Sequence, residues 1–287
     1  MTIVVSVKIN DGVVLSSDSA TTLSDDKGRV LNVYNNANKI FNLYKGLPIA
    51  AATWGSGSIG RASISTLAKD LRARFVNGPE DLKINPLGYG IDEIANKVRS
   101  FMFKDKYKAA YGERKETPFL GLRVAGYSTN AELPEIYDLG IQNGQCAGPT
   151  LVSGQNDIGV HWNGESDAVR RLLVGFGAAT SEVLKAAGLD EAMIPTFVQQ
   201  IRPKLQADLC FAAMPVQDAV ELAEFLVRTQ IEFSRFQIGA QVVGGPIEIA
   251  TITKHEGFKW VARKHFYSRE LTPETWGNPD KDGETSQ

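Results

Sequence analysis

TIVVSVKINDGVVLSSD, residues 2–18, is the stretch that decides the fold. Residues 2–9 and 13–17 are rich in Val and Ile, a composition typical of β-strands. Asn10-Asp11-Gly12 lies between them, and Asp-Gly is a strong hairpin signal because type I′ turns need residues that tolerate positive φ. The chain is therefore predicted to open with an antiparallel hairpin.

Blocks of strands and blocks of helices follow one another along the rest of the chain. Strand composition covers 30–34, 39–44, 47–53, 119–126, 135–141, 157–162, 246–253 and 257–262. Apolar residues at helical spacing cover 62–75, 91–103, 166–187 and 216–236. Segregated blocks predict a layered α+β chain, whereas alternating βαβ units would predict a parallel sheet.

The domain organisation follows from length and composition. We expect a single domain over 1–262, with a helical insertion near 188–210 that carries Pro195 and Pro203. The composition turns polar from about Arg263, so we expect 263–287 to form a polar, partly disordered C-terminal tail.

Overall composition excludes several classes of function. The 287 residues carry a net charge of −2, which creates no field that favours nucleic acid. No apolar run is long enough to span a membrane, and residues 1–8 lack the basic segment of a signal peptide. A cytoplasmic protein that binds neither nucleic acid nor membrane is expected.

Cysteine and histidine are too sparse for a metal site. Cys146 and Cys210 are the only cysteines and have no CxxC spacing, which fits a reducing compartment and argues against disulfides and structural zinc. The three histidines, His161, His255 and His265, are not spaced along the chain as metal ligands are. We expect neither a metal nor another cofactor.

Thr2 is a candidate nucleophile. A small second residue permits removal of Met1, which would leave a threonine with a free α-amine. That amine can take the hydroxyl proton, because its ordinary pKa of about 7.7–8.0 leaves a useful neutral fraction near pH 7. Thr2 alone is weak evidence, since a threonine in second position also occurs by chance.

Asp18 and Lys39 could complete such a site. Asp18 closes the second predicted strand, and Lys39 opens a later one, so adjacent strands could bring both beside Thr2. A lysine there would favour the neutral amine and stabilise the alkoxide, and an aspartate would fix the lysine. In the competing interpretation Asp18 is a turn residue and Lys39 a solvated strand end.

The segment 55–60, Gly-Ser-Gly-Ser-Ile-Gly, matches the GxGxxG pattern of dinucleotide sites. The preceding strands are hairpin-linked, and the polar, turn-rich region 76–90 contains no second parallel strand. We therefore favour a close strand-to-helix turn, whose amides could equally stabilise an oxyanion.

Four segments together resemble the proteasome β-subunit and HslV superfamily of N-terminal-nucleophile hydrolases. They are residues 2–7, 11–18, 38–41 and 51–56, and the spacing between Thr2 and Asp18 also matches. The resemblance implies a four-layer αββα sandwich, with Thr2 as nucleophile, Asp18 and Lys39 beside it, and Gly55 N–H as oxyanion donor. It also implies a specificity pocket formed by Thr21, Ala37, Phe41, Thr53 and Gly57.

The resemblance covers roughly residues 2–260 and weakens toward the end. The family's Gly-Ser-Gly, whose serine supports the threonine amine, has its nearest counterpart in Asn163-Gly164-Glu165-Ser166, where Glu165 or Ser166 could serve. The resemblance further implies a peptide or unfolded-protein substrate, a homo-oligomeric ring or related assembly, and an ATP-dependent unfoldase as partner.

Three functions follow as hypotheses. The first is a threonine peptidase that acts after Met1 is removed. The second is an inactive scaffold subunit, which would result if Met1 persisted and blocked the amine. The third is a small-molecule amidase of the same fold.

Overall fold

Two five-stranded antiparallel sheets form the body of the protein. The computed structural model describes residues 2–25, 29–112, 114 and 116–264. The first sheet contains, in spatial order, β12 (Gly159–Gly164), β1 (Ile3–Ile9), β2 (Gly12–Ser17), β13 (Glu248–Thr253) and β14 (Gly257–Ala262). The second contains β11 (Gln145–Ser153), β10 (Glu135–Gln142), β9 (Leu120–Gly126), β6 (Ile49–Gly55) and β5 (Ile40–Asn42).

The predicted opening hairpin is confirmed. β1 and β2 pair in antiparallel register, with Ile9 opposite Gly12 at the turn. A Cβ on Gly12 would lie 2.5 Å from the carbonyl oxygen of Ile252, so only glycine fits where β13 approaches this turn. Every residue of β1 is buried, because the hairpin lies at the centre of the first sheet and is covered on both faces.

Alternate residues of β1 contact different layers. Ile3 and Val5 pack in a cluster with α7 (Val216–Phe236) and α4 (Asp167–Val174), on the outer face of the first sheet. Val4 packs in another cluster, which joins the two sheets. Successive side chains of a strand point to opposite faces of the sheet, and here both faces are covered. This is why the sequence of β1 is apolar at nearly every position.

Helices also cover the outer face of the second sheet. They are α1 (Ile64–Asn77) and α2 (Ile91–Arg99), which continues through a π-helical turn (Ser100–Tyr107) into α3 (Lys108–Tyr111). The expected α+β chain is thus confirmed, with two main antiparallel sheets and flanking helices. Two small hairpins complete the strands: β3 (Thr21–Ser24) with β4 (Val30–Tyr34), and β7 (Ser58–Ile59) with β8 (Ala62–Ser63).

The prediction of one helix over 166–187 is wrong, because the structure has two separate helices in this segment. Gly175 ends α4 with φ +86°, and a second helix, α5 (Thr180–Ala186), begins after a turn. Leu205, at the end of a later helix, packs closely against this position: a Cβ at position 175 would lie 2.8 Å from its carbonyl oxygen. Glycine is therefore needed where α4 ends. Strand β11 was also not predicted, since its polar, half-exposed sequence lacks the apolar signal of a core strand.

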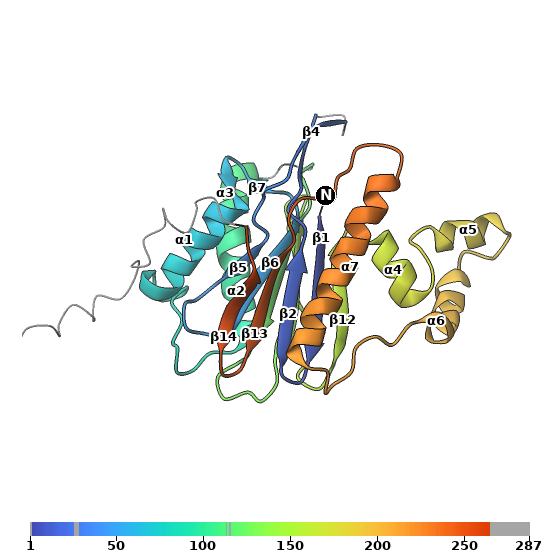
Figure 1. Cartoon of the computed structure of the whole chain (residues 1–287). Helices are drawn as coiled ribbons and strands as arrows, with labels where there is room; N and C mark the ends of the chain where they lie inside the picture. Colours follow the sequence, from blue (N-terminus) through green and yellow to red (C-terminus); the bar gives the residue numbers. More distant parts are fainter. Residues whose placement is uncertain (1, 26–28, 113, 115, 265–287) are drawn as a thin grey trace, which may run out of the picture.

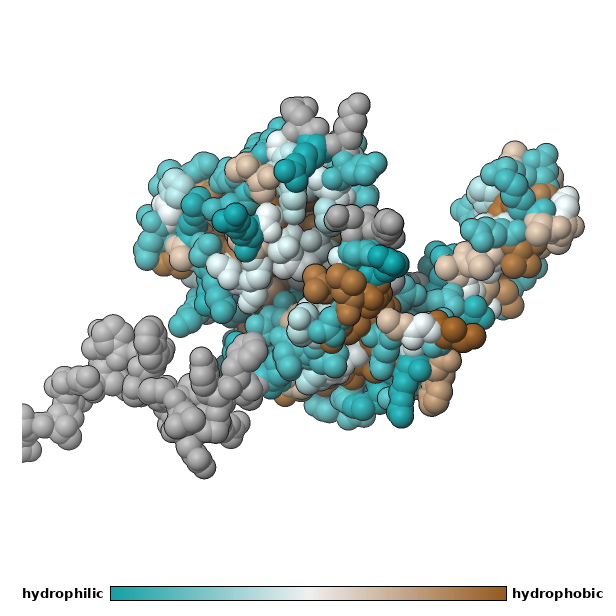
Figure 2. Space-filling view, turned by 90° about the horizontal axis from the view of Figure 1, so that it is seen from above, coloured by the Kyte–Doolittle hydropathy of each residue, from teal (hydrophilic) through white to brown (hydrophobic). Residues whose placement is uncertain are grey.

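Helices α5 and α6 (Ile194–Leu205) stand apart from the sheets as a projecting arm, seen at the right of Figures 1 and 2. α6 falls within the segment 188–210, where an inserted helical region was expected. Of these two helices, only Ile194 is buried. Most of the expected tail, 265–287, lies outside the described residues.

The GxGxxG segment does not belong to a parallel unit. β6 ends at Gly55 and pairs antiparallel with both of its neighbours, β5 and β9. The classical dinucleotide-binding arrangement needs a parallel βαβ unit at this position. Within the described ranges, no helix is long and apolar enough to cross a membrane.

Candidate active site

Asp18 lies at the end of β2, completely buried, and its carboxylate organises the N-terminal end of β1. Oδ1 accepts a hydrogen bond from Ile3 N at 3.1 Å. Oδ2 accepts from Ala20 N at 3.1 Å and from Gly244 N at 3.0 Å. A carboxylate that replaces its lost hydration with several N–H donors can be buried in the charged state.

Lys39 immediately precedes β5 and forms a buried ion pair with this carboxylate. Its Nζ lies 2.6 Å from Asp18 Oδ1. Burial lowers the pKa of Lys39, and the negative charge of Asp18 partly opposes that shift. The interpretation of Asp18 and Lys39 as a turn residue and a solvated strand end is therefore wrong: both are buried and in contact.

Thr2 lies directly beside this ion pair. Asp18 Oδ1 binds both Lys39 Nζ and the backbone N–H of Ile3, the residue that follows Thr2. Thr2 is nearly buried and lines a cavity of about 380 Å³, whose wall also includes Lys39. The structure thus brings the three residues predicted from the sequence into one place.

Gly164 and Glu165 hold Thr2 from the opposite side. The backbone N–H of Glu165 donates to the carbonyl oxygen of Thr2 at 2.7 Å. A Cβ on Gly164 would lie 1.9 Å from that same oxygen, so only glycine allows β12 to approach Thr2 this closely. Ser166 begins the turn into α4, where its carbonyl oxygen accepts from Arg170 N. Neither Glu165 nor Ser166 lines the cavity.

Gly55 and most residues of the expected specificity pocket line the cavity. Gly55 has φ +84° at the end of β6, and a Cβ there would lie 2.4 Å from the carbonyl oxygen of Phe119. The expected pocket residues that line the cavity are Thr21, Ala37, Thr53 and Gly57. Phe41 does not line it, because its side chain packs in the core between the second sheet and α1.

A second buried ion pair, not predicted from the sequence, lies next to the first. Glu248 opens β13 opposite Ser17, the neighbour of Asp18. Its Oε2 lies 3.0 Å from Lys264 Nζ, and the two side chains are 1% and 7% exposed. A single glutamate in an apolar strand indicates that a positively charged side chain is buried with it, but nothing in the sequence indicates which of the many lysines this is.

No arrangement for a metal is present in the part of the chain that the structure describes: no three His, Cys, Asp or Glu side chains are grouped to hold an ion. The cavity lining combines apolar surface, as from Trp54 and Ile64, with hydroxyl, amide and amine groups. The polar groups are contributed by Thr2, Thr21, Asn36, Asn38, Lys39, Thr53, Ser56, Ser63, Ser65 and Lys69.

No protein family is matched by the sequence. No curated protein matches it either. Several solved structures are similar in fold. An Anbu (Gly-1) mutant from Hyphomicrobium sp. strain MC1 has a TM-score of 0.52 at 12% identity, covering 94% of this chain and 92% of that one. The Anbu complex from Pseudomonas aeruginosa, a helical assembly, has a TM-score of 0.50 at 15% identity, over 92% and 88%.

Anbu (ancestral beta-subunit) from Yersinia bercovieri has a TM-score of 0.49 at 13% identity, covering 92% of this chain and 89% of that one. At such low identity, these likenesses concern the fold alone. The proteasome-like fold implied by the sequence resemblance is thereby confirmed over most of the chain.

Proposed function

We propose that this protein is a threonine peptidase with the four-layer αββα fold of N-terminal-nucleophile hydrolases, and that Thr2 is its nucleophile once Met1 is removed. The observation that carries the proposal is the position of Thr2 on the cavity wall, beside the buried Asp18–Lys39 pair. A lysine whose charge is held by a carboxylate lowers the proton affinity of a neighbouring amine and stabilises a neighbouring alkoxide.

In the proposed reaction, the α-amine of Thr2 accepts the hydroxyl proton as Oγ attacks a peptide carbonyl carbon. The N–H of Gly55, at the end of β6, stabilises the oxyanion of the tetrahedral intermediate. The amine then returns the proton to the leaving nitrogen, and an acyl-enzyme remains on Oγ. Water, activated by the same amine, hydrolyses this ester and regenerates Thr2.

The first test is covalent labelling by an electrophile that needs both the hydroxyl and the amine of an N-terminal threonine. We expect the wild-type protein to gain one adduct, located on Thr2 by peptide mapping, and to hydrolyse a fluorogenic peptide. Thr2→Ala should lose both properties, whereas Thr2→Ser should keep the labelling. Peptide hydrolysis that survives in Thr2→Ala would refute the mechanism.

Intact mass separates the alternatives. If Met1 persists, the amine is acylated and the chain acts as the inactive scaffold subunit considered above. If Met1 is absent and Thr2 is labelled, but only small acyl-amides are cleaved, the chain is an amidase of the same fold. A panel of peptide and acyl-amide substrates distinguishes these outcomes.

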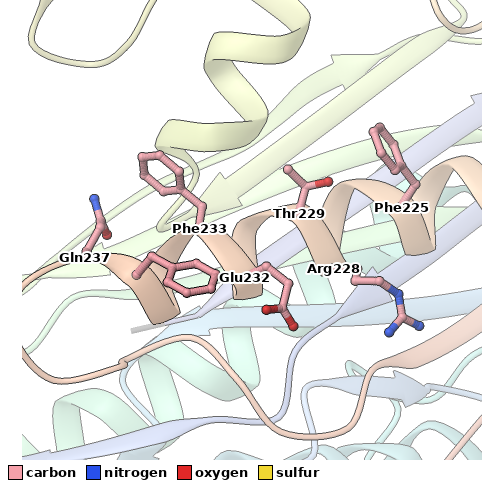
Figure 3. A pocket seen from close by; sticks show the side chains of 7 residues that line it. Phe225, Arg228, Thr229, Glu232, Phe233 and Gln237 are labelled. Carbon is pink, nitrogen blue, oxygen red and sulfur yellow. The ribbon is translucent and has the colours of Figure 1, made fainter.

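We further propose that the protein assembles with copies of itself, as the helical assembly of the Pseudomonas aeruginosa protein suggests. The candidate interface is the outer face of α7. Phe225, Thr229 and Phe233 point to one side of this helix, and Arg228 and Glu232 to the other (Figure 3). Phe225 is 50% exposed and Phe236 80% exposed, which is costly for side chains in contact with water.

Charge complementarity favours a second copy as the occupant of this face. Arg228 and Glu232 are one helical turn apart and lie midway between Phe225 and Phe236. When two α7 helices approach antiparallel about a two-fold axis, each Arg228 lies opposite a Glu232 of the second copy. Each Phe225 then lies near a Phe236 of that copy, so the same patch binds itself.

Light scattering after size-exclusion chromatography tests this interface. Phe225→Glu with Phe236→Glu should lower the molar mass, and Arg228→Glu should weaken assembly unless Glu232→Arg is added. Leu87→Glu is the control, because Leu87 is 87% exposed in a loop outside α7. An unchanged mass in the double phenylalanine variant would refute α7 as the interface.

Two finer proposals rest on the family resemblance. The protein acts in the cytoplasm, where its two half-buried thiols, Cys146 and Cys210, stay reduced. An ATP-dependent unfoldase delivers unfolded protein to a ring or related assembly of this chain. Co-purification of an ATPase with the assembled protein, and ATP-dependent degradation of a folded substrate, test the second of these.

A further inference from the structure

Lys264 lies outside the set of residues that the family resemblance assigns to the site, yet its amine is part of the same buried cluster. The residue follows β14, and its Nζ pairs with Glu248 at 3.0 Å. The same Nζ donates hydrogen bonds to Ser19 Oγ and to the carbonyl oxygen of Ala37, each at 2.7 Å. One carboxylate and two hydrogen-bond acceptors, from three segments, therefore converge on one nearly buried ammonium group.

Each of these acceptors is connected to the candidate site. Ser19 follows Asp18 directly, and its Oγ donates to the carbonyl oxygen of Pro246 at 2.6 Å. Ala37 lines the cavity, and its backbone N–H donates to the carbonyl oxygen of Ser19 at 2.9 Å. Lys264 thereby ties the start of β13 to the segment after Asp18 and to the cavity wall before Lys39.

The two ion pairs also form one electrostatic unit. Burial is the main cause of the lowered pKa of Lys39; repulsion by the charge of Lys264 adds to it, whereas Asp18 and, more weakly, Glu248 oppose it. Asp18 and Glu248 in turn favour the charged form of Lys264. Two buried amines and two buried carboxyl groups are thus paired within one cluster, so that each charge has an opposite charge beside it.

We propose that Lys264 is a positioning residue of the candidate active site, which holds the cavity wall through Ser19 and Ala37 and balances Glu248 behind the Asp18–Lys39 pair. This proposal rests on the proposed role of Thr2. If Lys264 is lost, Glu248 becomes an uncompensated negative charge that acts on Lys39, the lysine beside Thr2. A negative charge favours protonated amines, so Thr2 would hold its proton to higher pH and would be a weaker base at neutral pH.

Other charged groups near the site also influence the pKa of the Thr2 amine. Lys69 on α1 lines the cavity. Burial lowers the pKa of the Lys264 amine, and the charge of the neighbouring Arg263 adds a smaller effect in the same direction. Lys69 and Arg263 remain in every variant considered below. Glu165, after β12, contacts Thr2 through its backbone N–H. Because these groups are the same in every variant, they do not account for differences between the variants.

The experiment measures the pKa of the Thr2 α-amine directly, by pH-dependent trace acylation and mass spectrometry of protein produced with Thr2 as first residue. This measurement needs no catalysis, so the inference can fail or succeed independently of peptidase activity. For Lys264→Met we expect the amine pKa to rise by about half to one unit, which is about a three- to tenfold loss of neutral amine at pH 7.

Variants of opposite charge separate electrostatics from damage to the fold. Glu248→Gln should lower the pKa of the Thr2 amine, because it removes the negative charge and leaves Lys264 in place. The double variant Lys264→Met with Glu248→Gln should return the pKa toward wild type, and Lys264→Arg should stay close to it. Lys254→Met is the control, since this lysine lies in the β13–β14 turn and pairs with the exposed Glu132.

Two results would overturn the inference. One is an amine pKa in Lys264→Met that equals that of Lys254→Met. The other is a shift of the same sign in Lys264→Met and Glu248→Gln, which would indicate a general loosening of the cavity wall. Loss of peptide hydrolysis in Thr2→Ala, tested separately, concerns the proposed function and leaves this measurement intact.

Discussion

Breaking the Asp18–Lys39 pair tests whether a buried charge pair underlies the candidate site. Lys39→Met leaves Asp18 completely buried and without its cation. Loss of one partner of a buried ion pair costs about 3–5 kcal/mol. The three backbone N–H donors to Asp18 persist and partly stabilise its charge, so we expect about 3 kcal/mol, at the low end of that range.

Asp18→Asn should cost more, for a reason that lies in its hydrogen bonds. Oδ1 accepts from Ile3 N and Lys39 Nζ, and Oδ2 accepts from Ala20 N and Gly244 N. An amide NH₂ must replace one of these oxygens, so it faces two donors in either orientation. Adding about 1–3 kcal/mol for unsatisfied donors to the cost of an unpaired lysine gives about 5 kcal/mol.

The double variant Asp18→Asn with Lys39→Met removes both ions of this pair and leaves neither one unpaired, so it should cost about 2–3 kcal/mol less than the two single variants together. Urea unfolding followed by tryptophan fluorescence and circular dichroism measures these free energies of unfolding, and coincident transitions check the two-state assumption. Single-variant costs below about 1 kcal/mol, or strictly additive effects, would refute the reasoning, since a solvated pair behaves in that way.

Three further predictions concern residues around the site. Burial, then the charge of Arg123, lowers the pKa of His161 to about 4; the native state therefore binds fewer protons than the unfolded state between pH 4 and 6.5. Wild type should lose up to about 3 kcal/mol of stability relative to His161→Asn as the pH falls through that window, and equal pH profiles would contradict this. Gly164→Ala should abolish labelling of Thr2 by the electrophile, because its Cβ would displace the Thr2 carbonyl; unchanged labelling kinetics would show that β12 does not hold Thr2. Arg123→Met should cost about 2–4 kcal/mol in urea unfolding, because the buried guanidinium binds both carboxylate oxygens of Asp138 at 2.8 Å; a cost near zero would mean that this ion pair contributes no net stability.

How much the sequence could predict depends on how local each signal is. The β1–β2 hairpin was predictable, because its turn residues and its strands are adjacent in the chain. Thr2, Asp18 and Lys39 could be proposed together because they lie at the ends of closely spaced early strands. The break at Gly175 and the strand β11 were missed, since both depend on contacts with distant segments or on half-exposed, polar positions.

The amino-acid sequence by itself determined the block pattern of an α+β protein, the position of Thr2 and the kinds of side chain that could assist it. Only the tertiary structure decided that Asp18 and Lys39 are buried in contact, that Phe41 lies in the core, and that Lys264 belongs to the same cluster. The physical reason is separation along the chain: Lys264 meets Ser19 across 245 residues, and such a contact exists only after the two strand pairs have formed one sheet.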